Sequence, residues 1–288
     1  MKLFVAFWFV VFVFFFGLIP FWVLYRIADF IYFLLFKIFG YRKKVIVGNL
    51  RKAFPLKSEK EIQQILSAVY LNLSDVLIEG IKGFTMLRKQ VIKRHKITNP
   101  EVLESIYQSG VSIIGVTGHY CNWEWGSLSA SLQTQYEPVA FYKPLSNKWI
   151  DRFMHWSRSK FGTKLTSIYE TADTFNNRQD LKSIYLMAAD QNPAKAKKSI
   201  WVDFLGIDTA FLDGPERYAK KYNYPVVYMD VQRKKRGFYT IELSVIALNP
   251  SELPDGEITN RYAAKLESII LNDPGNWLWS HKRWKMKR

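Results

Sequence analysis

The N-terminus constrains the fold of this chain more than any other segment. Residues 3–25 carry no charged side chain, and as one helix these 23 residues would extend about 34 Å. The hydrocarbon core of a bilayer is roughly 30 Å thick, so the segment predicts a membrane helix. A cleaved secretory signal fits less well, because the run is long and no small-residue cleavage site follows it. Pro20 can kink such a helix, which leaves a re-entrant or deeply monotopic segment open.

The charges that flank this segment predict its orientation. Only Lys2 precedes it, whereas five basic residues follow it: Arg26, Lys37, Arg42, Lys43 and Lys44. The positive-inside rule then places the rest of the chain on the cytoplasmic side. A second apolar stretch, residues 27–40, is interpreted as an interfacial or membrane-dipping helix, with a core helix as the alternative. We therefore expect a membrane-anchoring segment at residues 1–40 and a cytoplasmic-face domain at residues 41–288.

The composition restricts the partners of the chain. It has 41 Lys and Arg against 25 Asp and Glu, a net charge of +16. No nucleic-acid-binding motif accompanies this charge, so nucleic acid is not expected as a partner. Beside a membrane helix, anionic lipid, an acidic carrier protein or a phosphorylated substrate fits better. Cys121 is the single cysteine, which excludes an intramolecular disulfide and a multi-thiolate metal centre, and we expect neither a metal nor another cofactor.

Apolar runs alternate with amphipathic stretches after residue 41. Ser58 and Glu61 have the spacing of a capping box that begins a long helix, and residues 111–117 form the continuous apolar run typical of a buried parallel strand. Further strands are expected at 138–142, 184–189 and 200–204, a helix at 122–132, and a hairpin at 225–231 and 238–245. The alternation predicts an α/β fold with a mostly parallel central sheet flanked by helices, besides the N-terminal membrane helix.

One pair of residues indicates chemistry. His119 comes directly after the apolar run, and Glu124 follows five residues later. Ligands of open α/β sheets bind at the carboxyl ends of the strands. If Glu124 accepts a hydrogen bond from one ring nitrogen, the other nitrogen can take the proton of an attacking hydroxyl group. The alternative is a structural role, with a histidine at a strand end and a glutamate that favours the helix dipole.

Short motifs around this pair extend along nearly the whole chain. They are Tyr41-Arg42-Lys43, Ala53-Phe54-Pro55, Gly118-His119 with Trp123-Glu124, Tyr142-Lys143-Pro144, Asp190-Gln191, Asp203-Phe204-Leu205-Gly206 and Trp277-Leu278-Trp279-Ser280-His281. In this order and spacing the sequence resembles the bacterial lipid A biosynthesis (lauroyl/myristoyl) acyltransferases. That family lies within the lysophospholipid acyltransferase-like superfamily.

The resemblance implies a glycerolipid acyltransferase-like fold and an enzyme of the inner membrane with its catalytic body on the cytoplasmic side. Such an enzyme moves a fatty acyl group from an acyl carrier protein, or from acyl-CoA, to a hydroxyl group of a hydroxyacyl chain on a lipid A precursor. By this resemblance His119 is the general base and Glu124 is its partner. Lys143 stands where arginine is common in the family, and Asn192 where a second aspartate is common.

Further residues are expected to bind substrate: Lys143, Arg158, Asp190, Gln191, Lys195, Lys197 and Lys198. Arg158 could hold the acyl donor, an oxyanion or a lipid phosphate, and Asp190 could orient Arg158 or the acceptor. The structural alternatives are a solvated helix charge for Arg158 and a turn-forming aspartate for Asp190. Cys121 is expected to be a bystander, because transfer from a thioester needs no covalent acyl-enzyme.

Two other functions remain open at this point. A related acyltransferase could use a different glycolipid or an aminoacyl lipid as acceptor. A membrane-tethered basic scaffold without enzymatic activity could also carry this charge. The scaffold would keep its function without His119, and its binding would weaken with salt.

Overall fold

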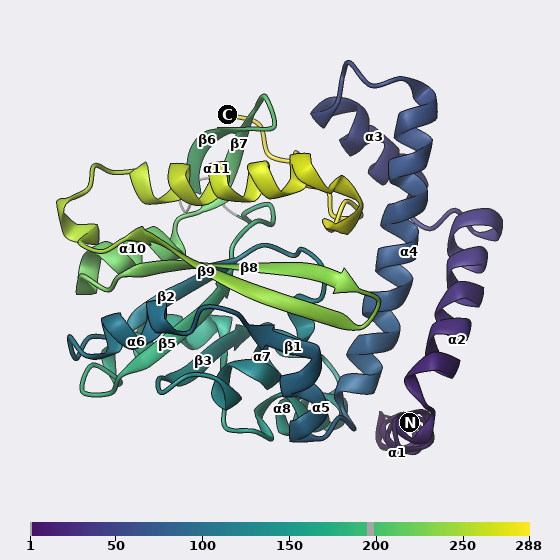
Figure 1. Cartoon of the computed structure of the whole chain (residues 1–288), viewed down its shortest axis with the longest axis horizontal. Coiled ribbons are helices and arrows are strands. Elements are labelled where there is room, and N and C mark those ends of the chain that lie inside the picture. The colour runs from purple at the N-terminus through teal and green to yellow at the C-terminus, as the bar shows by residue number, and fades with distance from the viewer. Residues whose placement is uncertain (1, 195–198) are drawn as a thin grey trace.

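The computed structural model describes residues 2–194 and 199–288 (Figure 1). The expected substrate-binding residues Lys195, Lys197 and Lys198 therefore lie outside the described residues.

A seven-stranded sheet forms the centre of the molecule, in the order β1-β9-β8-β2-β5-β3-β4. Four adjacent strands are parallel: β2 (Ile113–Thr117), β5 (Ser183–Ala188), β3 (Glu137–Tyr142) and β4 (Lys164–Ser167). β8 (Val226–Lys235) continues them in parallel and turns back into β9 (Phe238–Ala247), and β1 (His95–Ile97) pairs parallel with β9 at the edge. The α/β class, the mostly parallel sheet and the late hairpin are confirmed.

Helices cover both faces of this sheet. Figure 1 shows α10 (Gly214–Tyr222) and α11 (Glu257–Asn272) on one side, and α6 (Glu101–Tyr107), α7 (Gly126–Ser129) and α8 (Lys148–Ser159) on the other. The remaining helices of the body are α3 (Lys43–Ala53), α4 (Glu59–Gly83), α5 (Arg88–Arg94) and α9 (Thr171–Asn176). The predicted capping box is present at the start of α4, where Ser58 and Glu61 bond each other's backbone N–H groups.

Two expected elements differ from the observed ones. The strand expected at 200–204 is β6 (Ser199–Phe204), but among the described residues it pairs only with β7 (Ile207–Leu212), in a separate antiparallel hairpin. Leu205 and Gly206 both have positive φ and reverse the chain within two residues, as tight hairpins require. The helix expected at 122–132 is divided into the short pieces η2 (Trp123–Trp125), α7 and η3 (Ala130–Leu132).

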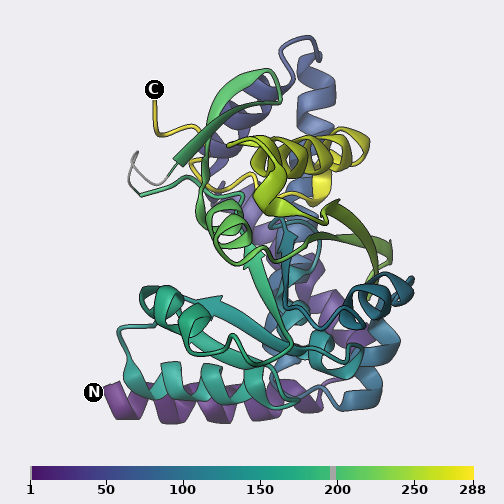
Figure 2. The same cartoon turned by 90° about the vertical axis from the view of Figure 1, so that its left-hand side faces the viewer.

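Residues 3–25 do not form one continuous helix, and the kink that Pro20 allowed is a break between two helices. α1 (Lys2–Leu18) ends before Pro20, and α2 (Phe21–Phe33) begins after it, because proline lacks an N–H group and restricts the residue before it. Figure 2 shows α1 lying alongside α8, whereas α2 runs along α4 in Figure 1. The second apolar stretch, residues 27–40, comprises the second half of α2 and a π-helical turn that continues it, η1 (Leu34–Ile38). Both α2 and η1 pack against α4.

α1 has 17 residues and a length of about 26 Å, which is short for a bilayer crossing. Among the described helices, α4 alone is long and apolar enough to cross a membrane, and half of its most apolar window is buried inside the protein. α4 is therefore a core helix against which α1 and α2 pack.

Candidate active site

His119 follows the carboxyl end of the central strand β2 and is bonded to an aspartate that follows the neighbouring strand β5. Its Nδ1 atom is 2.5 Å from Oδ1 of Asp190, and its backbone N–H donates to Oδ2 of the same carboxylate at 2.8 Å. The Asp190 side chain is 2% exposed and the His119 side chain 17%. The imidazole is thus fixed by two bonds to one buried carboxylate.

The sheet register brings these two residues together. Thr117 of β2 lies opposite Ala188 of β5, so the residues that follow the two strands emerge side by side. A Cβ atom at Gly118 would lie 2.7 Å from the end of the Leu266 side chain in α11 and 3.3 Å from Asp190. The glycine therefore permits the close approach of α11 and of the Asp190 carboxylate.

The C-terminal part of the chain completes the carboxylate's surroundings. The indole N–H of Trp277 donates to Oδ2 of Asp190 at 2.8 Å. Backbone hydrogen bonds join the segment to the histidine loop, from Leu278 to the His119 carbonyl and from Cys121 to the Asn276 carbonyl. Trp277 is buried, so its ring packs in the core beside this carboxylate.

Electrostatics favours the imidazole as a proton acceptor. Burial by itself would lower the pKa of His119, but the charge of Asp190, its hydrogen bond and the charge of Glu124 together raise that pKa above its usual value. The same pairing holds the pKa of Asp190 well below its usual range although burial opposes it. The carboxylate is therefore ionised near neutral pH and stabilises the protonated imidazole.

Gln191 forms a hydrogen bond with the second ring nitrogen of His119. Its side-chain Nε2 atom is 3.1 Å from Nε2 of His119. If Nδ1 carries the proton that bonds Asp190, Nε2 of the ring is an acceptor for the glutamine N–H. The nitrogen available for chemistry is consequently the one that faces Gln191.

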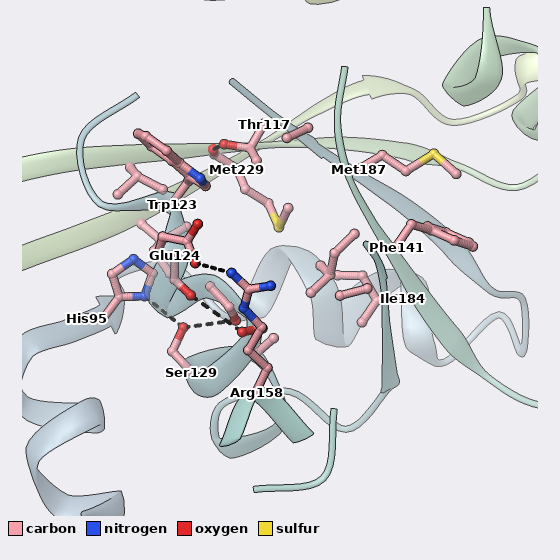
Figure 3. A pocket seen from close by; sticks show the side chains of 18 of the residues that line it. His95, Thr117, Trp123, Glu124, Ser129, Phe141, Arg158, Ile184, Met187 and Met229 are labelled. Atoms are coloured by element: carbon pink, nitrogen blue, oxygen red, sulfur yellow. Dashed lines mark hydrogen bonds and ion pairs between the residues drawn. The ribbon is translucent and has the colours of Figure 1, made fainter. Parts of the chain in front are cut away.

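The structure does not show the expected hydrogen bond between Glu124 and His119. Oε2 of Glu124 accepts instead from the Arg158 guanidinium at 2.7 Å, and Figure 3 shows these two groups facing each other across the pocket. Glu124 remains near enough to raise the pKa of His119 by its charge. Asp190, which we expected to orient Arg158 or the acceptor, takes the orienting position on the imidazole.

An apolar cavity of about 300 Å³ extends from His119 along one face of the sheet. Ile184, Leu186 and Ala188 alternate along β5 and therefore share the face that lines it. His119, Glu124, Arg158 and Lys143 line it as well, and Lys143 is exposed. The arrangement combines an apolar pocket with a few polar groups, as binding sites for small ligands do.

A buried carboxylate supports the loop that carries these residues. Glu79 of α4 is 1% exposed and accepts hydrogen bonds from Asn122, from Tyr25 of α2 and from Tyr239 of β9. Asn122 in turn caps the following turn by accepting from the backbone of Trp125. The position of Glu124 thus depends on contacts with three separate elements.

The environments of Cys121 and Asn192 indicate structural roles for these two residues. Cys121 is buried, and burial raises the pKa of its thiol to about 12, which disfavours the nucleophilic thiolate. Asn192 donates its backbone N–H to His281.

Within the described residues no cluster of three His, Cys, Asp or Glu side chains is placed to hold a metal ion.

Comparison with known proteins identifies the family. Residues 1–286 match the family described as bacterial lipid A biosynthesis acyltransferase. The chain belongs to this family. The bacterial lipid A biosynthesis acyltransferases transfer acyl groups, so the chain is an acyltransferase with an acyl donor and a lipid A acceptor.

Two relatives from this family are similar over most of their length. A lipid A biosynthesis acyltransferase of Haemophilus influenzae is 25% identical over 236 residues, which cover 80% of this chain and 72% of the relative. A lipid A biosynthesis lauroyltransferase of Escherichia coli K12 is 21% identical over 287 residues, covering 93% of this chain and 87% of the relative.

Proposed function

We propose that His119 is the general base that takes the proton of a lipid A precursor's hydroxyl group as that group attacks an acyl thioester, with Asp190 orienting the imidazole. The observation that carries the proposal is the Asp190–Nδ1 hydrogen bond at the rim of an apolar cavity. It supports a neutral imidazole whose Nε2 atom accepts a proton once the acceptor hydroxyl displaces Gln191.

The chemical steps balance without a covalent enzyme intermediate. Nε2 takes the hydroxyl proton while the hydroxyl oxygen attacks the thioester carbonyl carbon. The tetrahedral intermediate then expels the thiolate, which takes the proton from the imidazolium, and an ester and a free thiol result. A positioned base contributes about 10²–10⁴-fold, and the alignment of two bound substrates contributes more.

Arg158 has a separate role in this proposal. Its guanidinium is held by Glu124 at 2.7 Å and lines the cavity beside His119. A positive charge there would stabilise the developing charge on the thioester oxygen. Glu124 is then a positioning residue for Arg158, which differs from the His/Glu base pair that the resemblance implies.

The finer assignments belong to this proposal as well. We expect an acyl carrier protein as donor, with acyl-CoA as the alternative, because an acidic carrier complements the net charge of +16. Residues 1–40 would contact the inner membrane from its cytoplasmic side, with residues 41–288 as the catalytic body. The late, lauroyl- or myristoyl-transferring type is the expected subclass.

The test uses the purified full chain in detergent micelles with a lipid A precursor and either a fatty acyl carrier protein or acyl-CoA. Mass spectrometry should show the precursor gaining one acyl chain, with the carrier-protein thioester as the preferred donor. His119→Asn should lower this rate by at least about 10²-fold. Near-wild-type transfer by that variant would exclude His119 as the base, and no transfer to the precursor by the wild type would exclude the acceptor class.

A further inference from the structure

A second apolar cavity adjoins the one at His119. It has a volume of about 480 Å³ and lies between α4, α8 and α1, with Leu77, Met154 and Phe9 in its wall. Of the described residues that line it, only Glu124 and Arg158 are charged. Each of the two cavities is large enough for a ligand of moderate size.

The two cavities meet at one polar point. Trp123, Glu124 and Arg158 line both of them, so the ion pair stands in the common wall. The Trp123 ring also lies 5.1 Å from the ring of His119. Two chains that entered the cavities from opposite directions would bring their polar ends together beside the imidazole.

The two cavities differ in their surroundings, and this difference indicates which acyl chain, that of the donor or that of the acceptor, each cavity holds. The first cavity is lined by sheet residues such as Ile184, Met229 and Ile241 and lies under the central sheet. The second is walled by α1, whose exposed surface is apolar, and by the half-exposed Leu77. An acyl chain brought by a soluble thioester must leave water completely, whereas the chains of an acceptor lipid stay continuous with a membrane.

We infer that the α4–α8 cavity holds the hydroxyacyl chain of the acceptor lipid and that the cavity under the sheet holds the acyl chain of the donor. The inference rests on the proposed function. It assigns the substrate selectivity of the enzyme to two separate surfaces, one for each chain.

Two glycines allow each cavity to be filled separately. Gly80 lines the α4–α8 cavity and Gly126 lines the cavity under the sheet, and at both positions an added Cβ atom meets nothing within 4 Å. Gly126 has ordinary helical dihedral angles, and Gly80 lies inside α4. Leucine should therefore be tolerated by the backbone at both sites, because it favours helix over glycine.

The experiment measures both chain-length profiles in each variant. The donors are saturated acyl carrier protein thioesters from decanoyl to palmitoyl, and the acceptors are lipid A precursors with full-length or shortened hydroxyacyl chains. Gly80→Leu should raise KM for the full-length acceptor about tenfold, since it displaces one to two methylene groups, and should leave the order of donor preference as it is. Gly126→Leu should shift the preferred donor to a shorter chain and leave acceptor preference as it is.

Gly48→Leu is the matched control. Gly48 lies in α3, lines neither cavity and also has nothing within 4 Å of an added Cβ atom, so this variant should behave as wild type in both profiles. Exchanged effects of the two cavity variants would reverse the assignment of the chains and overturn the inference. Unchanged profiles in folded variants, verified by circular dichroism, would overturn it too. A wild-type protein that transfers nothing to the precursor would instead contradict the proposed function.

Discussion

At the candidate active site, two carboxylates near one imidazole have different surroundings, and the proposed mechanism gives them different roles. Asp190 is buried and bonded to His119 and Trp277, so its charge acts on the ring. Glu124 is about one-third exposed and bonded to Arg158, so its charge is largely compensated by the guanidinium. The pKa of His119 therefore depends more on Asp190 than on Glu124.

The pH profile of acyl transfer should separate these tasks. In the proposed mechanism the neutral imidazole is the active form, so kcat/KM should rise with pH through the raised pKa of His119. Asp190→Asn removes the carboxylate that raises this pKa most, so the rising limb should move to lower pH while kcat falls by about 10²–10⁴-fold. The measurement is kcat/KM from pH 5 to pH 9 with saturating donor.

Glu124→Gln provides the comparison for this prediction. It should lower kcat because Arg158 loses the ion pair at 2.7 Å, but it should move the rising limb much less than Asp190→Asn does. If Glu124→Gln moved the limb further, the carboxylate that governs the imidazole would be Glu124.

The sequence predicted the residues of this site better than their contacts. The spacing of His119 and Glu124 reports only on local neighbours, and both residues do line the same cavity. The partner of the ring lies 71 residues away, because β2 and β5 are adjacent in the sheet. Strand order cannot be read from one sequence, so the direct contact of Asp190 could not be predicted. The Trp277 contact had no signal beyond a buried aromatic residue.

Among the elements, α1 is held by an unusual contact with α4. Lys82 is 6% exposed, and its Nζ atom donates to the carbonyl oxygens of Gly17 and Ile19 at the end of α1. Gly17 lies in the last turn of α1, where carbonyl groups generally lack a partner within the helix, and Ile19 lies just after the helix. Gly17 itself lies so close to Thr85 that a Cβ atom would clash.

Lys82→Met should therefore loosen α1 while the sheet stays intact. The substitution leaves two carbonyl groups without this donor, at a cost of about 1–3 kcal/mol each where they stay buried. We expect faster limited proteolysis at residues 17–20, measured by mass spectrometry of the fragments. Lys60→Met, at an exposed position of the same helix, should leave the cleavage rate unchanged. Equal protection in both variants would show that packing alone holds α1.

Element boundaries illustrate where sequence patterns are sufficient. β2 and the capping box of α4 are strong local signals, and both lie where they were expected. β1 and β4 have three and four residues and include lysines, so no apolar run marks them. The break after α1 depends on Pro20 and on packing against α4, of which only the proline is visible in the sequence.

At the scale of the whole molecule, large apolar side chains are exposed on the N-terminal helices and on α8. Phe4 is 67% exposed, Phe15 63% and Trp22 72%, and Trp156 of α8 is exposed as well. Figure 2 shows α1 and α8 lying side by side, and the rings of Phe9 and Phe153 are in contact between them. An exposed apolar surface on adjacent helices favours a lipid environment.

We predict that this surface binds vesicles. The triple variant Phe4→Ser, Phe7→Ser, Phe15→Ser should lower the partition coefficient for phosphatidylglycerol vesicles at least about a hundredfold, because each phenyl ring contributes about 1.5–3 kcal/mol when it leaves water. The partition coefficient is obtained from the fraction of protein that floats with the vesicles. The residues are exposed, so the fold should be retained.

Leu56→Ser is the control for this prediction. Leu56 is 98% exposed, and it precedes α4 at the end opposite the contact with α1. Its vesicle binding should equal that of the wild type. If the triple variant still floated while high salt released it, the basic charge and not the apolar surface would account for the binding.

The bonds around His119 have a consequence for how activity arises during folding. The imidazole is bonded to a group 71 residues away, and that carboxylate to an indole a further 87 residues along the chain. Two long loops must therefore close before His119, Asp190 and Trp277 meet, and such closure is slow compared with helix formation. Under the proposed mechanism, helices and short-range pairs form in a refolding chain before any acyl transfer is measurable.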